Sequence, residues 1–327
     1  MSYHPRIETA DLTSFITTRC RNSELWFVNN RPLENAILGY VGKFTARYDV
    51  KLYAFAIEGN HTHCVADFPG LNRAAFMRDL NSCIARSVRR LVPKFPGGPL
   101  WGRRYSVELM PAPDDVEEYF FYTVLQPIKD GLVQQLSDYP GYNCFRDAIW
   151  GTKRRFTVVD WAGYNSAKRY NKSIRFDDYV HYITLKYERL PGYEKLSQAA
   201  YAKMMIQKLE VRRQKIVADR LKAGLSFMGR DRLLTVQPGS LPVFTKTSSR
   251  YSHRPRILSV DHQRRAEYRE WYFSILQQYI DASRRYRQGD RKVRFPAGTF
   301  LPLLFGGSDP PTSANNRHRA NGFQNRP

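Results

Sequence analysis

The sequence predicts an α+β protein in which helices cover an antiparallel sheet. The first observation is the order strand, helix, two strands, helix, strand, helix over residues 1–150. The second is a pair of strand-like runs, 51–57 and 61–68, joined by the short turn Glu58-Gly59-Asn60. The third is the helical spacing of apolar residues between the strand-like runs.

Each expected element has its own local signal. The strand-like runs are rich in aromatic and β-branched residues, whereas the helix-like segments repeat apolar residues every three or four positions, as at Phe76, Leu80 and Ile84. The pattern Asp114-Asp115-Val116-Glu117 is typical of a capping box that opens a third helix, and Pro127 predicts its end or a kink. The expected strands are residues 15–20, 25–28, 51–57, 61–68 and 101–110, and the expected helices are residues 32–48, 72–92 and 115–126.

Positive charge is concentrated in the second half of the 327 residues. Residues 1–150 carry 17 Lys and Arg against 16 Asp and Glu, and residues 151–327 carry 35 against 14, so that nearly all of the net charge of +22 lies after residue 150. A basic region of this strength indicates binding to a polyanion such as the backbone of a nucleic acid, because bound phosphates release their counterions. The alternative is a basic surface that serves solubility alone.

The chain divides into four expected parts. Residues 1–151 form the α+β domain, residues 152–175 a linker, residues 176–305 a basic and mainly helical extension, and residues 306–327 a disordered tail rich in Gly, Pro, Asn and Ser. Two long helices are expected in the extension, at 196–222 and 261–287.

Several classes of protein are disfavoured by composition. No apolar run approaches the ~18 residues that span a membrane, so no membrane partner is expected. The first 15 residues lack the pattern of a signal peptide. The four cysteines are far apart and form no CxxC pair, which is typical of reduced thiols in a cytoplasmic protein.

The residues that point to chemistry are two histidines, a tyrosine and a glutamine. His61 and His63 are two apart on an expected strand, so both imidazoles project from one face and are able to share an ion. Tyr122 and Gln126 are four apart on an expected helix and therefore lie on one helical face. Taken alone, such a histidine pair is more often two ordinary surface or packed residues, and Tyr122 is more often a core aromatic within the run 119–122.

Three motifs in a fixed order resemble the single-tyrosine HUH transposases, and among them the REP-associated tyrosine transposases and their insertion-sequence relatives. The motifs are Asn60-His61-Thr62-His63, the segment PLWGRRY at 99–105, and the segment YTVLQPIKDGLV at 122–133. The resemblance extends over roughly residues 10–151, and the segment 138–151 resembles the end of that family's domain.

The resemblance implies a fold, a set of residue roles and a reaction. The fold would be a ferredoxin-like antiparallel sheet with helices on one side, and residues 1–151 would be the catalytic domain. His61, His63 and Gln126 would hold a divalent ion, Mg²⁺ or Mn²⁺, and Tyr122 would be the nucleophile that cleaves and rejoins DNA through a 5′-phosphotyrosine intermediate. The partner would be single-stranded or hairpin DNA, bound by a monomer or homodimer.

Two positions depart from the family pattern. Thr62 replaces the usual hydrophobic residue between the histidines, and Gln126 stands where the REP-associated group often has Asn. The glutamine is closer to the insertion-sequence pattern.

Basic residues near these motifs are candidates for holding the phosphates of the strand, although a solvated surface explains them equally well. They are Arg73, Arg78, Arg86, Arg89, Arg90, Arg103, Arg104 and Lys129.

Three other functions remain open at this point. A relaxase or rolling-circle initiator would use the same ion and tyrosine, but relaxases place the tyrosine before the histidines, and initiators usually have Lys where this chain has Leu125. A non-catalytic DNA-binding relative would keep the fold. An RNA-binding module is disfavoured because no RRM or KH signature is present.

Overall fold

The computed structural model describes residues 4–242 and 256–302. Its centre is a four-stranded antiparallel sheet in the order β2-β3-β1-β4. The strands are β1 (Thr13–Arg19), β2 (Lys51–Ile57), β3 (His61–Asp67) and β4 (Ser106–Met110). With α1 (Arg31–Arg47) after β1 and α2 (Arg73–Leu91) after β3, the chain order is βαββαβ. The predicted α+β class with a ferredoxin-like sheet is therefore confirmed.

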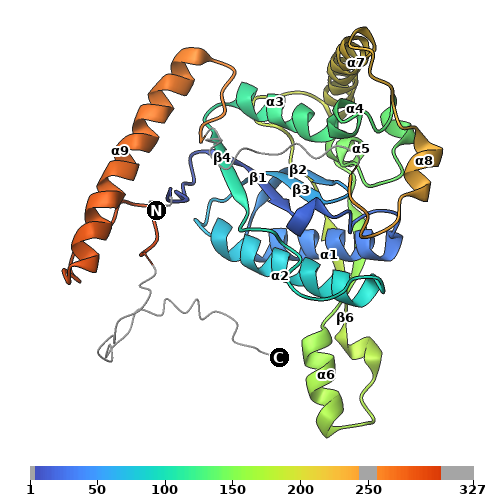
Figure 1. Ribbon diagram of the computed structural model, residues 1–327, viewed down its shortest axis with the longest axis horizontal. Coiled ribbons are helices and arrows are strands. Elements are labelled where there is room, and N and C mark those ends of the chain that lie inside the picture. Colours follow the sequence, from blue (N-terminus) through green and yellow to red (C-terminus); the bar gives the residue numbers. More distant parts are fainter. Residues whose placement is uncertain (1–3, 243–255, 303–327) are drawn as a thin grey trace.

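Helices lie on both faces of this sheet, and the expectation of one covered side is wrong. Successive residues of a strand point to opposite faces. On β1, Ser14 accepts a hydrogen bond from Arg73 of α2, whereas the ring of Phe15 contacts those of Tyr119 and Tyr122 on α3 (Pro113–Val124). Figure 1 shows α1 and α2 on one side of the strands and α3, α4 and α5 on the other.

Local signals place most elements of the first domain correctly. The side chain of Asn30 accepts a hydrogen bond from the backbone N–H of Leu33, and Pro32 occupies the first turn, so α1 starts where its sequence predicts. The expected helices at 32–48 and 72–92 are confirmed by α1 and α2, and the expected strands at 51–57 and 61–68 by β2 and β3.

Two expected strands differ from the structure. Residues 25–28 form no strand, because their backbone makes isolated bonds to distant segments, as from Phe27 to Gly59. The strand expected at 101–110 begins only at Ser106, after an isolated bridge between Trp101 and Cys20. A short 3₁₀ turn (Arg21–Ser23) follows β1, and its Asn22 has positive φ.

The expected third helix is two helices. α3 ends at Val124, and the short α4 (Gln126–Lys129) begins after Leu125, with Pro127 in its first turn. A 3₁₀ turn (Leu136–Asp138) and α5 (Phe145–Trp150) complete the domain.

Residues 152–175, expected to be a linker, contain regular structure. β5 (Arg154–Val159) pairs with β6 (Val180–Leu185), and α6 (Trp161–Tyr170) and a 3₁₀ turn (Phe176–Tyr179) connect them. This hairpin packs on α1 at Gly39 and Gly42, where a Cβ on Gly39 would lie 2.7 Å from Val158. The partner strand lies 20 residues or more along the chain, so local sequence gave no sign of the pairing.

The rest of the extension is helical, as expected. Its helices are α7 (Gln198–Lys222), α8 (Arg230–Thr235) and α9 (His262–Arg287), and the long helices predicted at 196–222 and 261–287 are confirmed. α7 contacts α4 and α5. The tail predicted at 306–327 lies outside the described residues, and among the residues described here no helix is long and apolar enough to cross a membrane.

Candidate active site

The two histidines lie side by side on the face of β3 that is turned toward α3. Both are buried, and their Nε2 atoms are 3.0 Å apart. Two nitrogens that each bind one ion at about 2.1 Å are about 3 Å apart when the angle at the ion is near 90°. The histidine pair therefore has the spacing of two ligands on a shared cation.

Hydrogen bonds at the Nδ1 atoms fix the orientation of both histidine rings. Asn60 donates through Nδ2 to the carbonyl of Ser23, and its Oδ1 accepts a hydrogen bond from His61 Nδ1 at 2.7 Å. His63 Nδ1 is 3.0 Å from the hydroxyl of Thr17, its direct neighbour across the β1–β3 ladder. With Nδ1 of His61 acting as the donor, its Nε2 keeps a lone pair for a metal ion.

Burial keeps His61 uncharged. Desolvation, followed by the nearby His63, lowers the pKa of His61 well below its ordinary value. A neutral imidazole is the form that binds a metal ion.

Tyr122 lies next to the histidines, on α3. Its ring is half-buried, with its centroid 6.0 Å from that of His63 and 5.6 Å from that of Phe15. The ammonium of Lys129 is 4.3 Å from the centre of the Tyr122 ring, which is a cation–π contact.

Tyr119 is the neighbouring tyrosine on α3. Its ring centroid is 5.7 Å from that of Tyr122, and burial, followed by the charge of Tyr122, raises the pKa of Tyr119 to about 12. A phenol that resists ionisation is a poor nucleophile.

Gln126 begins α4, one turn after Tyr122. Its side chain is buried; Nε2 donates to Asp130 Oδ2 at 3.0 Å, and Oε1 has no hydrogen-bond partner within the part of the chain that the structure describes. A buried carbonyl oxygen without a partner is costly unless something binds it, and an amide oxygen is a suitable ligand for Mg²⁺ or Mn²⁺.

The donor set differs from a classical zinc cage. No group of three or more His, Cys, Asp or Glu side chains in the described segments is arranged to hold a metal ion. The candidate ligands are two imidazoles and one amide, which leave coordination positions for oxygens of water or phosphate.

The structure adds residues that sequence reasoning gave no role. Asn60 and Thr17 orient the histidines, and Asp130 bonds Gln126. Burial, with the charge of Asp130 as the second cause, raises the pKa of Glu58 to about 8, and Tyr139 bonds the same carboxyl group. Asn60 and Asp130 both lie inside the quoted motifs, so their proximity in sequence was the one available signal.

The basic candidates divide into engaged and exposed side chains. Arg73 is buried, where it donates to Ser14 and to the carbonyl of Ile7, so its guanidinium supports the fold and is not available to phosphate. Arg78 pairs with Asp79. Arg86 bonds Ser82 and Cys83, Arg89 bonds the carbonyl of Gly98, and Arg90 stacks on Trp161; Arg103 and Arg104 are exposed.

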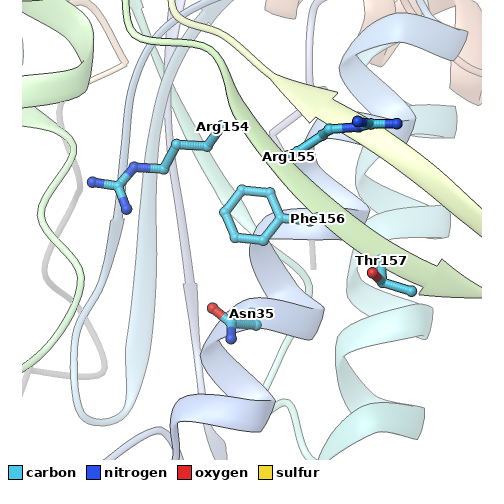
Figure 2. Close-up of a pocket in the computed structure, with 5 residues that line it drawn as sticks. All are labelled: Asn35, Arg154, Arg155, Phe156 and Thr157. Atoms are coloured by element: carbon cyan, nitrogen blue, oxygen red, sulfur yellow. The ribbon is translucent and has the colours of Figure 1, made fainter.

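A separate hollow lies between α1 and β5. Figure 2 shows the residues that line it, and none of the four candidate active-site residues is among them. They are Asn35, Arg154, Arg155, Phe156 and Thr157. Arg154 is held by an ion pair with Asp147, so the hollow is no rival to the histidine site.

The site now has a defined setting: an antiparallel βαββαβ domain with a histidine pair on a central strand and a tyrosine on an adjoining helix. This combination can be compared with known protein families. Residues 14–119 match the family model described as "Transposase IS200 like", which confirms the resemblance for this region and supports a transposase. Tyr122 and Gln126 lie just beyond the matched residues.

Solved structures show weaker likenesses. A REP-associated tyrosine transposase bound to a REP hairpin is 22% identical, with 45% of this chain and 85% of that chain covered and a TM-score of 0.37. A candidate transposase of Deinococcus radiodurans is 19% identical, with 31% and 81% covered and a TM-score of 0.26. The tRNA(His) guanylyltransferase of Saccharomyces cerevisiae is 7% identical, with 69% and 83% covered and a TM-score of 0.33. No curated protein sequence matches this chain.

Proposed function

We propose that this protein is a divalent-metal-dependent transposase that cleaves and rejoins single-stranded DNA through a 5′-phosphotyrosine intermediate at Tyr122. The observation that carries the proposal is that the Tyr122 ring lies against His63, whose Nε2 is 3.0 Å from that of His61. One helical turn after Tyr122, Gln126 has a buried amide oxygen that lacks a partner among the described residues. Folded proteins seldom leave a buried amide oxygen without a hydrogen-bond partner unless a ligand binds it.

The reaction follows from what these residues are able to do. His61, His63 and Gln126 would hold the ion, which when bound neutralises charge on the scissile phosphate. The phenol oxygen of Tyr122 attacks phosphorus and its proton passes to solvent; the bond from phosphorus to the 3′-oxygen breaks, and that oxygen takes up a proton as a 3′-hydroxyl. The phosphotyrosine ester keeps the energy of the phosphodiester, so the 3′-hydroxyl of another strand reverses the step and joins DNA.

Covalent capture tests this proposal. Wild-type protein incubated with hairpin-bearing single-stranded DNA and Mn²⁺ is expected to form an adduct that survives denaturing electrophoresis, and Tyr122→Phe is expected to form none. Tyr119→Phe is the matched control, because that ring lies on the same helix with its centroid 5.7 Å from that of Tyr122. If Tyr119→Phe formed no adduct and Tyr122→Phe still formed it, the nucleophile would be Tyr119, and the role proposed for Tyr122 would be wrong.

The segment that follows the first domain supplies a DNA-binding surface in the same proposal. We define the arm as residues 154–185, which form the β5–β6 hairpin and α6 (Figure 1). Lys168, Arg169 and Lys172 are exposed on the arm, and within the described residues no carboxylate lies within ion-pair distance of them. Tyr170 beside them is 89% exposed, as suits a ring that stacks on unpaired bases.

The arm is joined to the basic face of α2. The guanidinium of Arg90 lies 4.1 Å from the centre of the Trp161 ring at the start of α6. This stack places Arg90 of α2 against the start of the arm.

Replacing two arm cations tests the surface. Lys168→Ala/Arg169→Ala is expected to weaken binding of a single-stranded oligonucleotide about tenfold at low salt and to reduce the slope of log affinity against log salt by about 1.4, since each phosphate contact contributes about 0.7. The charge-matched control is Lys203→Ala/Lys222→Ala on α7, where both side chains are exposed. If both double variants lost the same affinity for the oligonucleotide, the loss would come from the change in net charge alone. The arm would then have no specific role in DNA binding.

A further inference from the structure

We propose that Asp130 is a positioning residue that sets which end of the Gln126 amide faces the metal site. The inference rests on the proposed function and names a residue for which the sequence assigned no role. Gln126 Nε2 donates to Asp130 Oδ2 at 3.0 Å, while Gln126 Oε1 is buried and without a partner among the described residues.

The chemistry of a carboxylate makes this contact directional. The two ends of a glutamine amide have nearly the same shape, but one only donates and the other only accepts. A carboxylate accepts hydrogen bonds and donates none, so Asp130 bonds the NH₂ end and leaves the oxygen on the opposite side. If the amide turned over, its NH₂ group would meet a cation, and two oxygens would face each other at Asp130.

The backbone holds Asp130 in place for this contact. Its N–H bonds the carbonyl of Gln126, so that the two side chains lie one helical turn apart on the same face of α4. The following turn is tied to the extension, since Arg220 donates to the carbonyl of Lys129 and the N–H of Met228 to the carbonyl of Gly131. The extension therefore helps to hold the turn next to Gln126, a candidate metal ligand of the first domain, and it also carries positive charge.

Titration of the metal-free protein with Mn²⁺, followed by calorimetry or by the paramagnetic resonance of free Mn²⁺, tests the inference. Asp130→Asn keeps the shape but offers both a donor and an acceptor, so it no longer selects one orientation of Gln126. Its affinity for Mn²⁺ is expected to fall by about tenfold or more, which is the usual effect of removing an outer partner of a metal ligand. Asp138→Asn, at an exposed position nearby in the chain, removes the same charge and is expected to bind as the wild type does.

A double variant that exchanges the amide and the carboxylate distinguishes the orientation of the residue 126 side chain from the stability of the protein. Gln126→Glu alone places two carboxylates against each other and is expected to bind Mn²⁺ poorly or to misfold. In Gln126→Glu/Asp130→Asn the asparagine donates to one carboxylate oxygen and leaves the other for the ion, so affinity is expected to return to within about threefold of the wild type.

The outcomes distinguish the existence of the metal site from the positioning role of Asp130. If the wild type binds Mn²⁺, His61→Ala abolishes binding and Asp130→Asn binds as tightly as the wild type, the role of Asp130 is overturned while the metal site stands. If the wild type binds no Mn²⁺, the metal site and the positioning role fail together. An unfolded Asp130→Asn variant leaves the decision to the double variant, whose failure to bind while folded counts against the inference.

Discussion

The two faces of the central sheet use the same strands for different purposes. The face toward α1 and α2 is apolar, with Ile16, Cys64 and Leu109 buried, and the buried Arg73 on that side donates to Ser14 and to the carbonyl of Ile7. The face toward α3 and α4 carries His61, His63 and the buried polar groups around them.

This difference shows where stability and chemistry are separated. Burial of apolar area stabilises the fold, whereas buried polar groups that await a ligand cost stability in its absence. We therefore expect substitutions on the two faces to have opposite signatures: loss of stability without loss of metal binding on one, and the reverse on the other.

The largest effect is expected from the apolar face. Phe76 on α2 is completely buried against Phe68 and Tyr48. Phe76→Ala leaves a cavity and is expected to lower the free energy of unfolding by about 3–5 kcal/mol, while Mn²⁺ affinity of the folded protein stays within about twofold. Urea unfolding and Mn²⁺ titration measure the two effects, and Phe76→Leu is the smaller step if the alanine variant does not fold. A large loss of Mn²⁺ affinity in the folded variant would break the comparison.

An intermediate effect is expected from Glu58, at the end of β2 beside the site. Burial, followed by the charge of Asp130, raises its pKa to about 8 from an ordinary value of 4.5. Between these values the folded protein keeps a proton that the unfolded chain has lost, so stability falls as the pH rises from about 4.5 through 8. Glu58→Gln removes this loss and is expected to stabilise the metal-free protein by about 1–2 kcal/mol at pH 8 and hardly at all at pH 4.5.

Unfolding by urea at pH 4.5, 6 and 8 in the presence of a chelator measures this difference. Tyr139→Phe, which removes the hydroxyl near Glu58, is the control for a change in hydrogen bonding without a change in charge. A pH dependence that is the same in Glu58→Gln and the wild type would show that the buried carboxyl does not carry the cost assigned to it.

How far the sequence predicted these features depended on whether the cause was local. The spacing of His61 and His63 on a strand fixed their shared face. Pro127 predicted a stop or kink after Gln126, whereas the helix breaks at Leu125, so Gln126 begins α4 and does not end α3. The helix expected at 32–48 followed from its apolar spacing, and the structure has α1 over Arg31–Arg47. Each of these signals lies within a few residues of the feature that it predicts.

What the sequence did not predict depends on contacts between distant residues. The segment at 152–175 is a strand and a helix because β5 pairs with β6 and both rest on Gly39 and Gly42 of α1. Arg73 was assigned to DNA by its charge, yet it is three residues before the buried Phe76 and so points into the core with it. The orientation of the Gln126 amide likewise follows only from the structure.

The smallest effect on stability, with a clear effect on binding, is expected from Thr17. Its hydroxyl is 3.0 Å from His63 Nδ1, directly across the β1–β3 ladder. Thr17→Val keeps the shape of the side chain and the strand but removes this hydrogen bond, so the ring is no longer fixed by an outer partner. We expect a loss of about 1 kcal/mol in stability and a fall of several-fold to tenfold in Mn²⁺ affinity, whereas Thr17→Ser, which retains the hydroxyl, is expected to stay near the wild type. If Thr17→Val lost stability alone and bound Mn²⁺ as tightly as before, the α3 face would be packed for stability like its opposite, and the contrast between the two faces would disappear.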